Sequence, residues 1–234
     1  MYTIKMAVSR FYYINLDKRP NRNEHFLKET ERENVPKERI QRFTAIDGDS
    51  HVFTQKELSL FEKGDFNSHW FGARIKGNQL SHYYIMKDIV EKKYPFSVIF
   101  QDDAILIPNF MELLTGVVEN LPKDAEMVNI GFHKFASGAH FVRWDFNEDF
   151  KTLSKKRLNK HVCVLNDTIN PCSLSYILTL KGAENMVHYF EKTGFLRATD
   201  GNFNDYCQRK GIFYGSIPVL VTGNSDLPSD IFLK

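Results

Sequence analysis

Short apolar segments rich in β-branched and aromatic residues alternate along this chain with longer segments whose apolar residues recur at helical spacing. The pattern predicts strands at 11–16, 42–46, 96–100, 127–132, 173–180 and 214–221, and helices at 20–34, 79–93, 110–121, 181–192 and 202–210. Strands that alternate with helices indicate a mostly parallel sheet with helices on its faces. We therefore predict an α/β fold.

The length of 234 residues suits one large α/β domain or two small ones, and the hydrophobic fraction of 42% is ordinary for a globular protein. The sequence shows no internal repeat, low-complexity tract or linker, so we expect a single domain over residues 1–234. The interval 133–168 is long, polar and aromatic. We expect it to be a lid or an acceptor-side elaboration.

The charge balance limits the class of partner. The chain carries 31 basic and 29 acidic residues, a net charge of +2, which gives no electrostatic reason to expect nucleic acid. Its three cysteines lack metal-binding spacing and fit free thiols in a reducing compartment. No apolar run has the length of a membrane span or a secretory signal. We expect a cytoplasmic protein that meets a membrane, if at all, through its substrate.

Two adjacent carboxylates, Asp102 and Asp103, directly follow the predicted strand 96–100. In open α/β sheets, ligands bind beyond the carboxyl ends of the strands. Neighbouring carboxylates are costly unless they are solvated or bind a cation, and Mg²⁺ or Mn²⁺ typically bridges such groups to substrate phosphates. The alternative is a solvated turn that caps the next helix. From the residues alone, both interpretations stay open.

Four groups of residues, in order along the chain, carry a resemblance to a known family. They are 13–22 (YINLDKRPNR); 45–48 (AIDG); 77–82 (GNQLSH) with 98–104 (VIFQDDA); and a late group at 176–178, 181–183, Asp200, Pro218 and 225–226. Together they resemble glycosyltransferase family 25, the lipopolysaccharide-biosynthesis glycosyltransferases that include the collagen galactosyltransferases. The resemblance spans nearly the whole chain.

The resemblance implies a GT-A-type fold, similar to nucleotide-diphospho-sugar transferases, a nucleotide-sugar donor that is often UDP-galactose, and inversion at the anomeric carbon. Two positions depart from the family pattern. Gln101 stands where the family usually has Glu, and Asn78 stands where it usually has Cys. The missing carboxylate lowers the local negative charge and therefore the expected metal affinity, although both aspartates remain.

Candidate donor-binding residues follow the first two predicted strands. The Asn15 amide can read a nucleobase edge, and Arg19 and Arg22 can pair with phosphate. The alternative for the arginines, and for Arg22 above all, is a solvated helix start. Asp47 can hydrogen-bond the nucleotide or shape its Asp-Gly turn, and we favour the turn.

Ser81 and His82 fall in the first turn of the predicted helix 79–93, where a polar pair would face the same rim as the acidic turn. They are further candidates for donor binding. The alternative is a helix cap together with a buried, hydrogen-bonded histidine.

An inverting transfer needs a base that takes the proton of the acceptor hydroxyl. Asp200 matches the late aspartate of the family and is predicted in a loop before a short helix, so it is the candidate base, with Asp205 in reserve. The alternative for Asp200 is an N-cap. Asp226 and Asp230 lie near the end of the sequence, where a loop could fold over the donor.

A basic run at 155–160 could attract diphosphate or an anionic acceptor, but such runs are usually solvated, and we favour that interpretation. His133, His140 and Trp144 are candidate acceptor contacts in the long interval.

We therefore predict a metal-dependent hexosyltransferase that moves a sugar, for instance galactose, from a UDP-sugar to a hydroxyl of a glycan, lipopolysaccharide or hydroxylated protein. Mn²⁺ or Mg²⁺ would bind at Asp103, helped by Asp102, and stabilise the leaving diphosphate. Gln101 supports one alternative, a catalytically inactive glycan- or nucleotide-binding protein on the same fold. A nucleotidyltransferase, which would release pyrophosphate, is the other.

Overall fold

The centre of the fold is an eight-stranded sheet in the order β2-β1-β3-β11-β5-β12-β10-β9. The computed structural model describes residues 8–64, 66, 72–132, 134–135, 141–142, 154–167, 172–224, 226–227 and 229–231. In the order of the sheet, the strands are Ile40–Thr44, Arg10–Asn15, Phe96–Gln101, Ser175–Thr179, Met127–Asn129, Tyr214–Ser216, Val162–Leu165 and Ser154–Arg157.

The sheet is mixed, and its parallel part lies at one end. Strands β2, β1 and β3 are parallel, and β5 and β12 form a further parallel pair, while β11 is antiparallel to both of its neighbours. Helices α1 (Pro20–Arg32) and α3 (Gly72–Lys92) lie in the connections between β1, β2 and β3. Such helical crossovers are what parallel neighbours require. The predicted α/β class, with a helix-flanked sheet, is confirmed.

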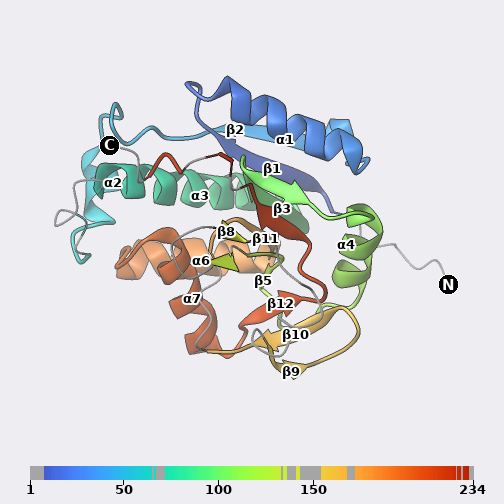
Figure 1. Cartoon of the computed structure of the whole chain (residues 1–234). Helices are drawn as coiled ribbons and strands as arrows, with labels where there is room; N and C mark the ends of the chain where they lie inside the picture. The colour runs from blue at the N-terminus through green and yellow to red at the C-terminus, as the bar shows by residue number, and fades with distance from the viewer. Residues whose placement is uncertain are drawn as a thin grey trace.

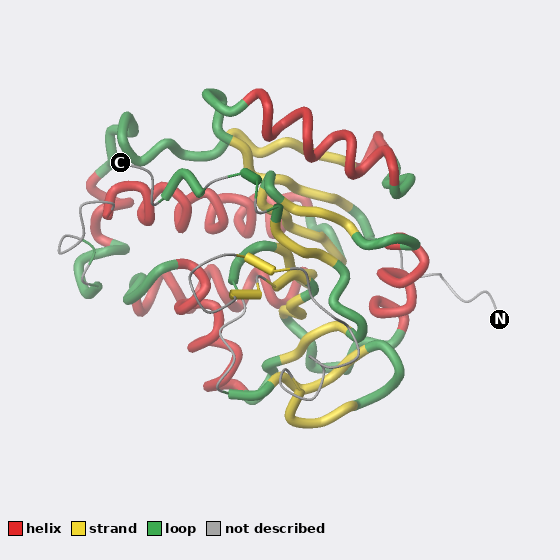
Figure 2. Tube along the Cα trace, in the orientation of Figure 1, coloured by secondary structure: helices red, strands yellow, loops and turns green. Residues whose placement is uncertain are grey.

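Helices α1 and α3 lie on the two sides of strand β1 (Figures 1 and 2). Tyr13 stacks on Phe26 of α1, with ring centroids 4.5 Å apart. Its neighbour Tyr12 donates a hydrogen bond from its hydroxyl to Asp88 of α3. Because successive residues of a strand point to opposite faces, α1 covers one face of the sheet and α3 the other. Helices α6 (Leu180–Thr193) and α7 (Thr199–Lys210) pack against α3.

The smaller elements complete the described chain. They are η1 (Lys37–Arg39), α2 (Gln55–Ser59), α4 (Phe110–Glu119), a second sheet β4-β13-β6 (Ala104–Leu106, Val221–Gly223, Gly131–Phe132) and the pair β7-β8 (Lys134–Phe135, Phe141–Val142). Within this part of the chain, every helix is too short or too polar to form a transmembrane span.

The second sheet fixes the turn that follows β3. Strand β4 pairs with β13 through Gly223 and Ala104, and the Asn224 N–H donates to the carbonyl oxygen of Asp103 at 2.8 Å. The predicted strands 127–132 and 214–221 are therefore each divided between two sheets. Their residues form β5 and β6 in the first case, and β12 and β13 in the second.

Helices α3 and α7 begin earlier than predicted. α3 starts at Gly72, so Ser81 and His82 lie in its interior and not in its first turn. α7 starts at Thr199, so Asp200 lies in the first helical turn and not in a loop. The N-cap position of α7 is Ala198, which corrects the N-cap alternative for Asp200.

Of the expected elaboration at 133–168, the described part includes a hairpin, β9-β10, that joins the main sheet through β12. His133, His140 and Trp144 lie outside the described residues.

The start of α3 packs closely against the loop after β2 because glycines face each other there. A Cβ atom on Gly77 would lie 2.3 Å from the carbonyl oxygen of Ile46, and one on Gly48 would lie 1.9 Å from that of Ala73. Both neighbours are backbone atoms, which cannot yield as a flexible side chain can. This contact sets the distance between α3 and the loop 45–48.

We expect Gly77→Ala to lower the free energy of unfolding by about 1–3 kcal/mol, because the added methyl overlaps backbone. Denaturant unfolding measures the change. Gly201→Ala in α7 is the matched control. Its Cβ would meet only the side chain of Arg197, at 3.1 Å, and alanine favours a helix. Equal effects of the two substitutions would contradict the packing argument.

Candidate active site

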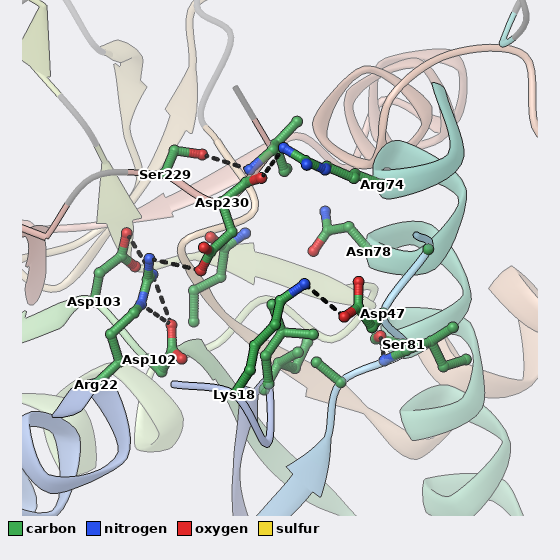
Figure 3. A pocket seen from close by; sticks show the side chains of 17 residues that line it. Lys18, Arg22, Asp47, Arg74, Asn78, Ser81, Asp102, Asp103, Ser229 and Asp230 are labelled. Atoms are coloured by element: carbon green, nitrogen blue, oxygen red, sulfur yellow. Dashed lines mark hydrogen bonds and ion pairs between the residues drawn. The ribbon is translucent and has the colours of Figure 1, made fainter. Parts of the chain in front are cut away.

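A pocket opens where the parallel strands β1, β2 and β3 end (Figure 3). The loops after these strands, helix α3 and the segment 229–231 form its walls. Its polar lining is Lys18, Arg22, Asp47, Arg74, Asn78, Ser81, Gln101, Asp102, Asp103, Ser229 and Asp230. The predicted position of the site, beyond the carboxyl end of β3, agrees with this pocket.

Arg22 joins the two carboxylates of the acidic turn. Its guanidinium lies 2.6 Å from Asp102 Oδ1 and 3.1 Å from Asp103 Oδ2. All three side chains are at most 10% exposed. Burial acts to lower the pKa of Arg22, but the attraction of Asp103 and Asp102 outweighs it, so the pKa lies above its usual value. Arg22 is therefore a fixed internal cation and not a solvated residue at a helix start.

Asp102 has a protein partner on each carboxylate oxygen. Oδ1 accepts from Arg22 Nε at 2.7 Å, and Oδ2 accepts from Asn15 Nδ2 at 2.6 Å. Burial raises the pKa of Asp102 from 3.8 to about 6, against the opposing effects of Arg22 and Asn15. Both oxygens are committed to protein donors, so Asp102 and Asn15 position the turn.

Asp103 differs from Asp102 because one of its carboxylate oxygens has no hydrogen-bond partner among the described residues. This oxygen, Oδ1, is buried. An orphan carboxylate oxygen beside a polar pocket suits a hard cation such as Mg²⁺ or Mn²⁺. Within the described residues, no three His, Cys, Asp or Glu side chains gather to hold a metal. A divalent ion here would use Asp103 and complete its coordination with ligand oxygens and water.

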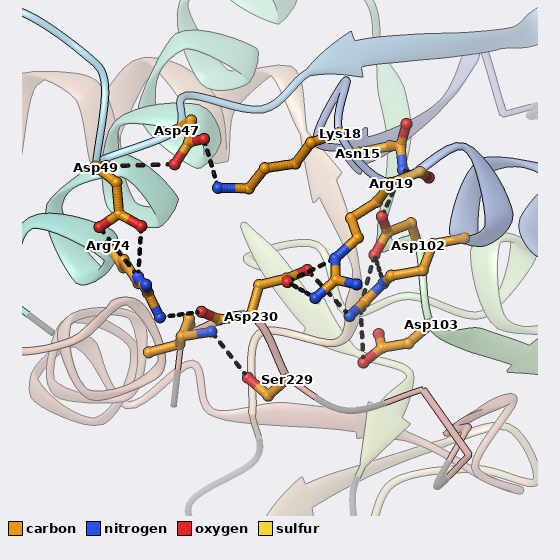
Figure 4. A network of polar contacts seen from close by, with 12 residues as sticks. Asn15, Lys18, Arg19, Asp47, Asp49, Arg74, Asp102, Asp103, Ser229 and Asp230 are labelled. Carbon is orange, nitrogen blue, oxygen red and sulfur yellow. Dashed lines mark hydrogen bonds and ion pairs between the residues drawn. The ribbon is translucent and has the colours of Figure 1, made fainter. Parts of the chain in front are cut away.

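The opposite wall of the pocket is basic (Figure 4). Two of its cations pair with aspartates, Lys18 with Asp47 at 2.5 Å and Arg74 with Asp49 at 2.8 Å, and Arg19 beside the pocket pairs with Asp230. Cations from the loop after β1 and from α3 thus converge at one cavity. Such an arrangement can bind a small ligand that carries several negative charges.

The comparison with known families agrees with this geometry. Residues 8–200 match the family model described as glycosyltransferase family 25 (LPS biosynthesis protein). The chain belongs to glycosyltransferase family 25. It is therefore a glycosyltransferase, which implies a sugar donor and an acceptor. No curated protein matches the chain significantly.

In this glycosyltransferase, Asp47 and Ser81 organise the loop after β2. Asp47 Oδ1 accepts from the N–H of Asp49 at 3.3 Å, which is a turn-shaping contact. Ser81 accepts from the N–H of Ile46 at 2.9 Å and donates to the carbonyl oxygen of Gly77 at 2.8 Å. Both residues line the pocket, and Ser81 also ties α3 to the loop.

His82 is not at the rim. It is fully buried, and its Nδ1 lies 2.8 Å from the Tyr176 hydroxyl. Burial lowers the pKa of His82 to about 3, so the ring is neutral. Within the described residues, it is not part of the pocket lining. The expectation that His82 faces the acidic turn is wrong, because α3 starts two turns earlier than predicted and the residue sits on the helix face that enters the core.

Asp200 lies close in sequence to a contact at the pocket edge. Its neighbour Thr199 accepts from Asn78 Nδ2 at 3.0 Å, and Asn78 lines the pocket. Asp205 pairs with Arg197 at 3.4 Å. Among the described residues, neither aspartate belongs to the pocket lining itself.

Sequence reasoning missed three pocket residues as ligand contacts. Lys18 and Asn78 lie within motifs quoted above, so their position was a usable signal. Arg74 lies in a segment without a regular pattern and gave no signal.

We expect Arg22→Met to lower the free energy of unfolding by about 3–5 kcal/mol, because it strands two buried carboxylates. Arg19→Met is the matched control. It also breaks an ion pair between an arginine and an aspartate, but the two side chains of that pair are 29% and 21% exposed. We therefore expect its free energy of unfolding to fall by less than about 1 kcal/mol. Urea unfolding of both variants tests this, and similar losses would refute the distinction.

Proposed function

We propose that this glycosyltransferase transfers a hexose from a UDP-sugar to an acceptor hydroxyl, with inversion at the anomeric carbon. One observation carries the proposal. A buried acidic turn with an orphan oxygen on Asp103 faces a wall of cations across the same pocket. A diphosphate with a bound divalent ion complements both sides.

The cations would bind the diphosphate of the donor. Guanidinium groups pair with phosphate oxygens through parallel hydrogen bonds, so Arg19 and Arg22 suit this role. The apolar lining at Ile14, Leu16 and Ala45 offers a surface for the nucleobase. Asp47 and Asn78 offer polar groups to the nucleoside.

The divalent ion, Mn²⁺ or Mg²⁺, would be held by Asp103, with Asp102 fixing the turn beneath it. When bound, the ion neutralises the charge that develops on the leaving diphosphate. Arg22 adds a second, permanent positive charge at the same place.

In the transfer step, the bond between the anomeric carbon and the diphosphate oxygen breaks, and a bond to the acceptor oxygen forms. The acceptor proton passes to a carboxylate, for which Asp200 is the candidate because it adjoins the Asn78–Thr199 contact. The nucleoside diphosphate leaves with the electron pair. A glycan, a lipopolysaccharide or a hydroxylated protein would supply the hydroxyl.

Gln101 favours one alternative, a donor-binding protein without transfer activity. Its side chain donates to Ser173 Oγ at 2.9 Å, where the family pattern has a carboxylate. Hydrolysis of UDP-sugar in the absence of acceptor, measured with and without Mn²⁺, distinguishes the two functions. Metal-stimulated hydrolysis supports the transferase, and binding without turnover supports the alternative.

We expect Asp103→Ala to weaken Mn²⁺-dependent UDP binding by more than about tenfold, because the orphan oxygen is removed. Calorimetry with Mn²⁺ and with a chelator measures the metal-dependent part. Gln101→Glu is the converse variant and should keep or strengthen metal binding by restoring a carboxylate. Unchanged metal dependence in Asp103→Ala would remove Asp103 from the site.

We expect Asp200→Asn to lower the transfer rate by about 10²–10⁴-fold with little change in donor affinity, because the amide cannot accept the proton. Asp205→Asn, in the same helix, is the control and should retain transfer. A transfer assay, UDP calorimetry and melting temperature are measured on both. Near-normal transfer by Asp200→Asn would move the search for the base elsewhere.

A further inference from the structure

The segment 229–231 occupies the pocket from the side opposite the acidic turn, and Asp230 makes its main contacts (Figure 4). Asp230 Oδ1 accepts from Arg19 Nε at 2.7 Å, and Oδ2 lies 3.6 Å from Arg22. The carbonyl oxygen of Asp230 accepts from Arg74 at 3.1 Å. One residue therefore contacts three arginines, Arg19, Arg22 and Arg74.

With this segment in place, the pocket is too small for a nucleotide sugar. Its free volume is about 90 Å³, whereas clefts that bind drug-sized ligands measure about 300–1,000 Å³. Ser229, Asp230 and Ile231 all belong to its lining. Asp230 takes the place beside Arg19 and Arg22 that the diphosphate of a donor would need.

The Asp230 carboxylate presents to Arg19 and Arg22 what a phosphate group would present, two anionic oxygens toward guanidinium groups. The Arg19–Asp230 pair is 29% and 21% exposed, and pairs at that exposure contribute little stability. The Arg22–Asp102 pair is 7% and 9% exposed and belongs to the fixed core of the site. Of the three carboxylates around Arg22, those of Asp102 and Asp103 are at most 10% exposed, and Asp230 is the one that can leave.

We propose that Asp230 is an internal competitor of the donor: it holds residues 229–231 in the pocket, and the diphosphate of the donor displaces it from Arg19 and Arg22. The inference rests on the proposed donor site. The family match ends at residue 200, so the family assignment does not cover this segment.

The opposite behaviour, in which the segment folds over a bound donor and clamps it, places like charges together. Asp230 would then keep its carboxylate on the arginines that bind the diphosphate. Two anions that share the same cations repel each other, which disfavours the clamp.

The first experiment measures UDP affinity by calorimetry in the presence of a chelator, so that only the protein's own cations bind the diphosphate. We expect Asp230→Asn to bind UDP roughly two- to tenfold more tightly than the unsubstituted chain, because the competing charge is gone. Asp226→Asn is the matched control, since it makes the same charge change at an exposed residue nearby, and it should leave the affinity unchanged. Unchanged or weaker binding by Asp230→Asn overturns the inference.

The second experiment follows the segment itself. Hydrogen exchange of peptides that contain 229–231 should become faster when UDP is added, while exchange in the loop 45–48 becomes slower. Slower exchange at 229–231 would show the segment closing on the ligand and would also overturn the inference.

The variant Arg19→Met distinguishes a failure of the proposed donor site from a failure of the competitor role of Asp230. If it weakens UDP binding while Asp230→Asn has no effect, the donor site stands and the competitor role fails. If UDP binds none of these proteins, or binds Arg19→Met as tightly as the unsubstituted chain, both the placement of the diphosphate and the competitor role are rejected.

Discussion

The pocket depends on one buried cation. Arg22, from the first turn of α1, neutralises Asp102 and Asp103 at the end of β3, 80 residues away in sequence for Asp102. Two buried carboxylates side by side repel each other, and burial adds a further penalty for each. The guanidinium supplies a permanent opposite charge, so the turn can remain acidic without a bound ligand. It also leaves one oxygen of Asp103 unused.

Keeping Asp102 ionised in this buried turn lowers the free energy of unfolding. The pKa of Asp102 is raised from 3.8 to about 6, so the native state binds more protons than the unfolded chain between these values. Stability from this group therefore falls as the pH rises through that interval. Buried groups that are ionised in the native state lower the free energy of unfolding, and such groups are typical of functional sites. The second sheet opposes the cost by fixing the turn through β4 and the Asn224–Asp103 hydrogen bond.

What could be predicted from the sequence was local. The apolar run before Asp102 marks a strand end, and that pattern alone located the acidic turn. The start of α3 was missed because Gly72 and Gly77 have low helical propensity, whereas tight packing on the loop 45–48 requires Gly77. His82 was misplaced as a consequence. Contacts such as Arg19–Asp230, between residues 211 apart, leave no periodic signal, so the occupation of the pocket was visible only in the structure.

The paired charges also restrict which ligands the pocket can accept. Lys18, Arg19 and Arg74 lie in or beside the pocket, yet each is paired with an aspartate, so the pocket offers solvent little net positive charge. A polyanion without further complementarity gains little there, in keeping with a chain whose net charge is only +2. At the donor site proposed above, a ligand would replace the Asp230 carboxylate with its own negative charge and also bring a cation to Asp103. A diphosphate with a bound divalent ion meets both conditions at once, whereas a phosphate monoester or a free metal ion meets only one.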